Sequence, residues 1–169
     1  MFPYWMRQSA YFIFVVFSFV VGFVGYVRSE DCLEPYRLEL RLFPSNESVL
    51  VMPLSKHEIF GIRYIHSVDI KPVFEIFETD PLKGLVLKET YFKMFGAGMG
   101  YISGRGKLGG NHNWIWISDI NEKVNGFILR VGSRRVAHTL LYRGREINLS
   151  NWWSGKMVRF VLKRNEWCR

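Results

Sequence analysis

Four ionisable side chains fall on the apolar faces of predicted strands, and they are the first candidates for chemistry. Because side chains alternate between the two faces of a strand, each of the four shares its face with large apolar residues. They are His66, Glu75, Glu89 and His138. Two further polar candidates are Ser67, on the face opposite His66, and Arg130, whose face the alternation leaves ambiguous.

A carboxylate placed among apolar groups must be paired, hydrogen-bonded or protonated, because burying an isolated charge is costly. The two histidines and two glutamates could satisfy one another in a network. They could also ligate zinc or iron, since imidazole nitrogen and carboxylate oxygen are common ligands of both metals. A third reading is a small-molecule pocket with a few convergent polar groups. Each residue taken singly is more often structural, so all these readings stay open.

Established catalytic motifs do not support an enzyme. His66 and Ser67 are adjacent, so on a strand they point to opposite faces and cannot form a simple Ser–His pair. The glycine-rich stretch 96–110 lacks the lysine and hydroxyl of a phosphate-binding loop. We therefore expect no cofactor, and a binding role is favoured over catalysis.

The elements that must position these side chains are strands. Short alternating or aromatic runs are separated by turn residues from residue 36 onwards, a pattern typical of an all-β domain. No convincing amphipathic helix follows residue 32. The spacing predicts an antiparallel β-sandwich or open barrel. The predicted strands are 36–43, 49–54, 59–68, 73–78, 85–94, 114–118, 126–131, 135–142 and 157–163.

The N-terminal segment reads as a membrane anchor. Residues 11–27 carry no charge, and with residues 8–10 they make about twenty residues, enough to cross a bilayer core of roughly 30 Å. A cleaved signal peptide is the alternative, but its apolar core is usually shorter. We expect an anchor over 1–28 and an extracytoplasmic β domain over 29–169. The predicted orientation is single-pass, with the N-terminus in the cytoplasm.

The two cysteines stand near the two ends of the predicted domain. Cys32 follows the apolar segment and Cys168 is the penultimate residue. Since domain termini are often close in space, we expect a disulfide between them, which an oxidising compartment would preserve. The alternative is two free thiols.

The charge pattern favours the lipid bilayer over nucleic acid as a partner. The formal net charge is +8, but the basic residues are scattered singly or in pairs and no nucleic-acid motif is present. A basic surface beside anionic lipid is the simplest interpretation, so the lipid bilayer is an expected partner and nucleic acid is not.

Three short signatures resemble those of a small domain-of-unknown-function family encoded beside TRAP transporters of the TAXI subclass. The signatures are Tyr64-Ile65-His66-Ser67-Val68 with Pro72-Val73-Phe74-Glu75, then Phe95-Gly96-Ala97-Gly98-Met99, and last Arg130-Val131-Gly132 followed by His138. The resemblance covers about half of the chain. After residue 98, the sequence Met99-Gly100-Tyr101 departs from the proline-containing turn that the family pattern leads us to expect.

The resemblance implies a secreted or membrane-anchored accessory protein for organic-anion uptake. It would contact the transporter's membrane subunit or its solute-binding protein. Two other functions remain open at this point: a metal-dependent or hydrolytic enzyme built on His66, Glu75, Glu89 and His138, and a structural envelope protein.

Overall fold

The computed structural model describes residues 33–95, 100–166 and 168, and it confirms the all-β prediction. All strand pairings are antiparallel. The strands are β1 (Tyr36–Phe43), β2 (Ser48–Leu54), β3 (Ile59–Ile65), β4 (Pro72–Asp80), β5 (Gly84–Phe92), β6 (Lys107–Gly110), β7 (Ile115–Ser118), β8 (Glu122–Lys123), β9 (Ile128–Arg130), β10 (Thr139–Tyr142), β11 (Arg145–Asn148) and β12 (Met157–Arg164).

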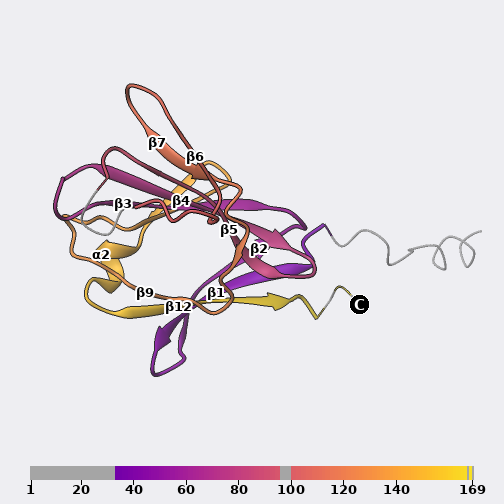
Figure 1. Ribbon diagram of the computed structural model, residues 1–169. Helices are drawn as coiled ribbons and strands as arrows, with labels where there is room; N and C mark the ends of the chain where they lie inside the picture. The colour runs from indigo at the N-terminus through magenta and orange to yellow at the C-terminus, as the bar shows by residue number, and fades with distance from the viewer. Residues whose placement is uncertain (1–32, 96–99, 167, 169) are drawn as a thin grey trace, which may run out of the picture. The chain divides into compact units, whose positions relative to one another are not determined.

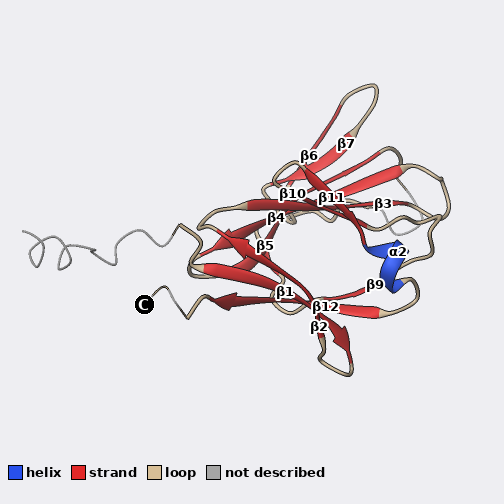
Figure 2. Cartoon of the chain, turned by 180° about the vertical axis from the view of Figure 1, so that it is seen from behind, coloured by secondary structure: helices blue, strands red, loops and turns tan. Residues whose placement is uncertain are grey.

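The strands form two sheets that face each other as layers (Figures 1 and 2). The smaller sheet has the order β2-β1-β12-β9. The larger has the order β11-β10-β3-β4-β5-β7-β6, and β8 pairs with β5 beside this path. Each sheet therefore has an inner face toward the other sheet and an outer face away from it.

The hydrophobic core lies between the inner faces. Phe60 and Phe77 of the larger sheet stack with centroids 5.3 Å apart, and Phe77 stacks on Phe127 at 5.3 Å. Phe127 in turn stacks on Phe160 of the smaller sheet at 4.5 Å. This column of four rings joins the two sheets, because offset-stacked aromatic pairs add to the burial of apolar area.

Strand β1 shows how period-2 alternation sets the layers. Leu38 and Leu40 are fully buried toward the larger sheet, as the alternation predicts. Between them, Glu39 accepts hydrogen bonds from Arg37 Nε at 2.8 Å and Arg41 Nε at 2.7 Å. Burial alone would raise the pKa of Glu39, but these hydrogen bonds hold it below its ordinary value.

One short helix, α2 (Leu149–Trp153), was not predicted from the sequence. The side chain of Asn148 caps it by accepting a hydrogen bond from the backbone N–H of Asn151 at 3.2 Å. A helix of five residues is too short for a 3.6-residue periodicity to show. The helix lies between the two layers in both views and buries Leu149 in the core (Figures 1 and 2).

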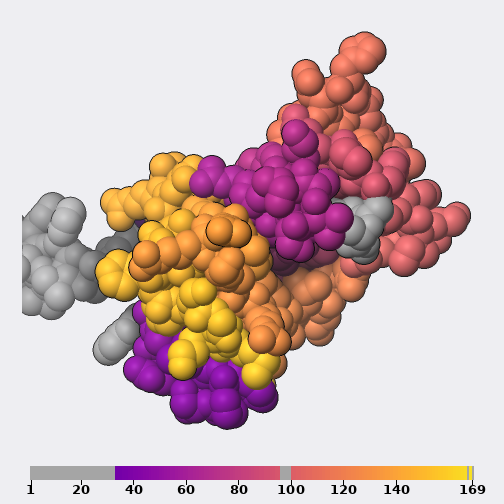
Figure 3. All heavy atoms as spheres, turned by 90° about the vertical axis from the view of Figure 1, so that its left-hand side faces the viewer, coloured from indigo at the N-terminus to yellow at the C-terminus, as the bar shows by residue number. Residues whose placement is uncertain are grey.

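The larger sheet has two ends of different character. We call one the loop end; it carries the segments 66–71, 93–95, 111–114 and 131–138, and Figure 3 is viewed from this side. We call the other the termini end; it carries the turns 55–58, 81–83 and 143–144. The chain enters β1 and leaves β12 at the termini end, where Asn165 N–H donates to Pro35 O at 2.8 Å.

The predicted anchor, residues 1–28, lies outside the described residues. Across 33–95, 100–166 and 168, no helix is both long and apolar enough for a bilayer crossing. Cys32 also lies outside the described residues, so the Cys32–Cys168 disulfide stays a prediction.

Candidate functional site

His138 lies at the loop end, directly before β10, and its side chain is buried. The backbone N–H of Gly132 donates to His138 Nδ1 at 2.9 Å. Because Nδ1 accepts this bond, neutral His138 carries its proton on Nε2. Burial lowers the pKa of His138, so the ring stays neutral at pH 7.

Tyr64 lies beside His138 on the inner face of the larger sheet, and Glu75 shares this face. The rings of Tyr64 and His138 have centroids 5.1 Å apart. Glu75 lies opposite Ile62, diagonally from Tyr64, as the alternation predicts. Burial, together with the charge of Glu75, raises the pKa of Tyr64 to about 12. We refer to Tyr64, Glu75 and His138 as the inner cluster.

Glu75 is the least compensated member of the inner cluster. Among the residues that the structure describes, none donates a hydrogen bond to its carboxylate or pairs with it as an ion. Burial raises the pKa of Glu75, and the charge of Arg105 opposes this rise only in part. Arg105 is itself paired with Glu122, its Nη2 lying 2.6 Å from Glu122 Oε2.

The predicted strand over 59–68 extends too far. Strand β3 ends at Ile65, and residues 66–71 form a hairpin loop in which Ile70 N–H donates to His66 O at 3.0 Å. His66 N–H donates to Lys71 O at 2.8 Å, directly after the Ile65–Pro72 pair, and its side chain is mostly buried at 12% exposure. Its Nδ1 lies 2.7 Å from Asp69 Oδ1 in the same loop.

The face predicted for Glu89 is also wrong. Ile76 pairs with Glu89 but the next residue of β4, Phe77, pairs with Leu87, so Lys88 is an extra residue in β5. This β-bulge shifts the alternation by one residue. Glu89 therefore lies on the outer face, where its carboxylate accepts a hydrogen bond from the Tyr91 hydroxyl.

The remaining candidates are exposed. Ser67 lies in the 66–71 loop, and Arg130 lies on the exposed side of β9, where Val131 takes the buried side. Glu75 and Glu89 point to opposite faces of one sheet, so His66, Glu75, Glu89 and His138 do not meet. Among the described residues, no group of three or more His, Cys, Asp or Glu side chains could hold a metal ion.

The outer face of the larger sheet holds a hollow that the sequence analysis missed. It has a volume of about 380 Å³, and we call it the aromatic groove. Its lining residues are Phe74, Ile76, Tyr91, Asn111, Trp114 and Trp116. Part of the signal was present in the sequence, because Trp114 and Trp116 are two residues apart and two such residues on a strand share one face.

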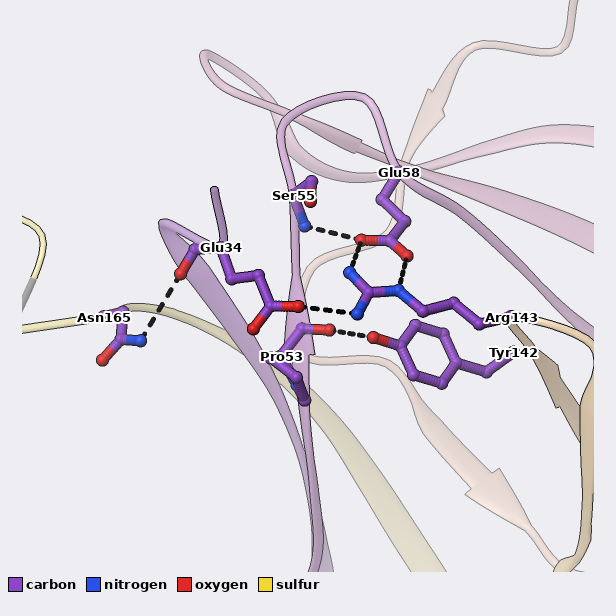
Figure 4. Close-up of polar contacts among 7 residues, drawn as sticks. All are labelled: Glu34, Pro53, Ser55, Glu58, Tyr142, Arg143 and Asn165. Carbon is purple, nitrogen blue, oxygen red and sulfur yellow. Dashed lines mark hydrogen bonds and ion pairs between the residues drawn. The ribbon is translucent and has the colours of Figure 1, made fainter. Parts of the chain in front are cut away.

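At the termini end, one arginine ties three segments together (Figure 4). The Arg143 guanidinium contacts Glu58 through Nε at 2.5 Å and Nη2 at 2.8 Å, and it contacts Glu34 through Nη1 at 2.6 Å. Tyr142 donates to the carbonyl of Pro53 beside it. The hydrogen bonds from Arg143 hold the pKa of Glu58 below its ordinary value.

Comparison with known proteins gives a family but no individual relative. No curated protein and no solved structure matches the chain. Residues 60–149 match the family described as a domain of unknown function, DUF1850. The matched range runs from β3 to the start of α2, so it contains the whole larger sheet, the inner cluster and the aromatic groove. Since the match spans more than half of the 169 residues, the chain belongs to the DUF1850 family.

Proposed function

We propose that this chain is a membrane-anchored extracytoplasmic accessory module that docks through its loop end on a TRAP-type solute transporter of the TAXI subclass. The partner is the transporter's membrane subunit or its solute-binding protein. The N-terminal anchor, with the N-terminus in the cytoplasm, holds the module at the outer membrane surface. The transporter association comes from the family resemblance described above, and the loop end supplies the physical argument for docking.

The observation that carries the proposal is the conformation of Ile70. This residue has φ +54° and a side chain that is 68% exposed. A β-branched residue is strained in the left-handed region, where glycine or asparagine is preferred. Burial within the domain does not offset this strain, because Ile70 is mostly exposed. Strained, exposed residues are characteristic of contact sites.

Other exposed apolar side chains belong to the loop-end segments. Val68 in the same loop as Ile70 is 70% exposed, and Met94 and Phe95 after β5 are both more than half exposed. Exposed apolar surface can mark an interaction site. A protein partner can cover such apolar surface, which supports docking through this end.

Site-specific photocrosslinking in cells tests the proposal. A photoreactive residue placed at position 68 or 70 of the full chain should crosslink a TRAP subunit, and the adduct should be identifiable by mass spectrometry. The matched control is Leu82, which is 95% exposed in a turn at the termini end. We expect no adduct from position 82. Equal labelling from both ends, or none from positions 68 and 70 in cells that express the transporter, would contradict the proposal.

A further inference from the structure

The aromatic groove is built from a row of rings across three neighbouring strands. Phe74 of β4 lies opposite Tyr91 of β5, and Tyr91 lies opposite Trp116 of β7. The Tyr91 and Trp116 centroids are 6.4 Å apart. Trp114 closes one side, with its ring 5.6 Å from Phe74 in an edge-on arrangement. Four ring systems therefore converge on one hollow outside the hydrophobic core.

A glycine on the next strand fixes the Trp116 ring. Gly109 of β6 pairs with Trp116, and a Cβ atom at Gly109 would lie 2.4 Å from Trp116 Nε1. The indole therefore lies against the backbone of β6, where any side chain would displace it. The absence of a side chain at Gly109 therefore leaves room for the Trp116 ring at this edge of the groove.

One ring of the groove already contacts a cation. Lys93 Nζ lies 3.7 Å from the centroid of the Trp114 ring. Aromatic faces carry negative quadrupole potential and attract cations, and tryptophan does so most strongly. The Trp114 ring therefore stabilises a positive charge of the chain itself.

A carboxylate adds negative charge beside the row. Glu89 accepts a hydrogen bond from the Tyr91 hydroxyl on the same outer face. Among the residues that the structure describes, no lysine, arginine or histidine forms an ion pair with Glu89. Glu89 therefore places negative charge next to one ring of the groove.

The lining decides which kind of cation fits. Two of the six lining residues, Asn111 and Tyr91, carry polar side-chain groups that are already hydrogen-bonded. Asn111 Oδ1 accepts hydrogen bonds from the backbone N–H groups of Asn113 at 2.8 Å and Trp114 at 2.9 Å, and the Tyr91 hydroxyl donates to Glu89. The lining residues therefore offer few free acceptors to the donors of a primary ammonium or a sugar. A quaternary ammonium group has no donors to satisfy.

We propose that the aromatic groove binds a quaternary ammonium group, with the rings of Phe74, Tyr91, Trp114 and Trp116 as its walls and Glu89 as its counter-ion. The volume of about 380 Å³ lies within the usual range for small-molecule sites. Recognition of choline-like groups by aromatic cages is an established use of the cation–π interaction. This inference does not depend on the docking proposed for the loop end.

The test uses the full chain, labelled with 5-fluorotryptophan, in a maltoside detergent that contains no choline. Titration with choline should shift the ¹⁹F signals of Trp114 and Trp116. Its neutral isostere, 3,3-dimethylbutan-1-ol, should bind at least about tenfold more weakly. Trp152 is 76% exposed on α2 and is the internal control, whose signal should not move. Equal binding of choline and the isostere, or no shift with choline, would overturn the proposal.

Two variants outside the hydrophobic core test the roles assigned to Glu89 and Lys93. Glu89→Gln should weaken choline binding about threefold to tenfold, because the counter-ion is lost. Lys93→Met should strengthen binding about threefold, because the competing ammonium is removed from Trp114. Choline affinity unchanged in both variants would refute the assigned geometry. Nanodiscs of phosphatidylcholine and of phosphatidylglycerol distinguish the ligand's source, since a lipid headgroup would shift the same signals only in the former.

Discussion

The two ends of the larger sheet differ in how their carboxylates are compensated. At the termini end, the Arg143 guanidinium pairs with both Glu34 and Glu58. Near the loop end, Glu75 has a raised pKa without an ion-pair partner among the described residues, and Ile70 is exposed in a strained conformation. Both ends belong to one sheet and one core, so the difference is local: the termini end ties its charges together, and the loop end is the surface for which we proposed contact with a partner.

The largest effect on stability should come from the termini end. Arg143→Met should lower the free energy of unfolding by about 1–2 kcal/mol, because the half-buried Glu58 loses a two-point partner. Urea denaturation of the full chain measures this loss. Arg145→Met is the matched control, since Arg145 forms no ion pair with any described residue. Equal losses in the two variants would show that the network contributes no more than general surface charge.

The stability lost in Arg143→Met should depend on pH in a defined direction. The folded-state pKa of Glu58 lies below its ordinary value of 4.5. Its stabilisation is therefore present above pH 4.5 and is lost as the pH falls through the folded-state pKa. The difference in unfolding free energy between the natural chain and Arg143→Met should shrink over that acidic window.

Glu75 should show the opposite dependence. Its folded-state pKa is raised above 4.5, so its favourable protonation is present below pH 4.5 and is lost as the pH rises through the folded-state pKa. Glu75→Gln should therefore raise the free energy of unfolding at neutral pH by up to about 1 kcal/mol, and this gain should vanish in acid. Urea denaturation at pH 4 and pH 7 measures it.

Glu58→Gln is the control for that measurement, because it should destabilise the domain at neutral pH. A Glu75→Gln variant that loses stability at pH 7, as Glu58→Gln does, would mean that Glu75 has a compensating partner after all. The contrast drawn between the two ends would then fail for carboxylates.

Sequence reasoning recovered the strands because apolar alternation survives wherever a strand has one buried face. Strand β1 was predicted with its observed bounds, and Glu75 was placed on the correct face. The face of Glu89 and the end of β3 were missed for a common reason. Each depends on a local break in the ladder, a strand end after Ile65 and a bulge at Lys88, and neither break leaves a glycine or proline at its own position.

The aromatic groove was missed for a different reason. Its residues lie far apart in sequence, from Phe74 to Trp116, and only the β4-β5-β7 order makes them neighbours. A single sequence fixes the alternation within each strand but not which strands pair, since pairing depends on contacts between distant segments. The inner cluster likewise needed the β3–β10 pairing to bring His138 beside Tyr64.

The smallest effect on the free energy of unfolding should come from Ile70, where stability and partner capture are expected to change in opposite directions. Ile70→Asn replaces a β-branched residue at φ +54° with one that tolerates this conformation. Because the isoleucine is mostly exposed, little burial is lost, and the free energy of unfolding should rise by about 0.5 kcal/mol. In the same variant, capture of the TRAP subunit proposed as the partner should fall. Val68→Ser, at an ordinary φ, is the control for stability and should leave it unchanged within about 0.5 kcal/mol. A loss of stability in Ile70→Asn would mean that Ile70 packs within the domain, whereas a gain with undiminished capture would remove Ile70 from the docking surface.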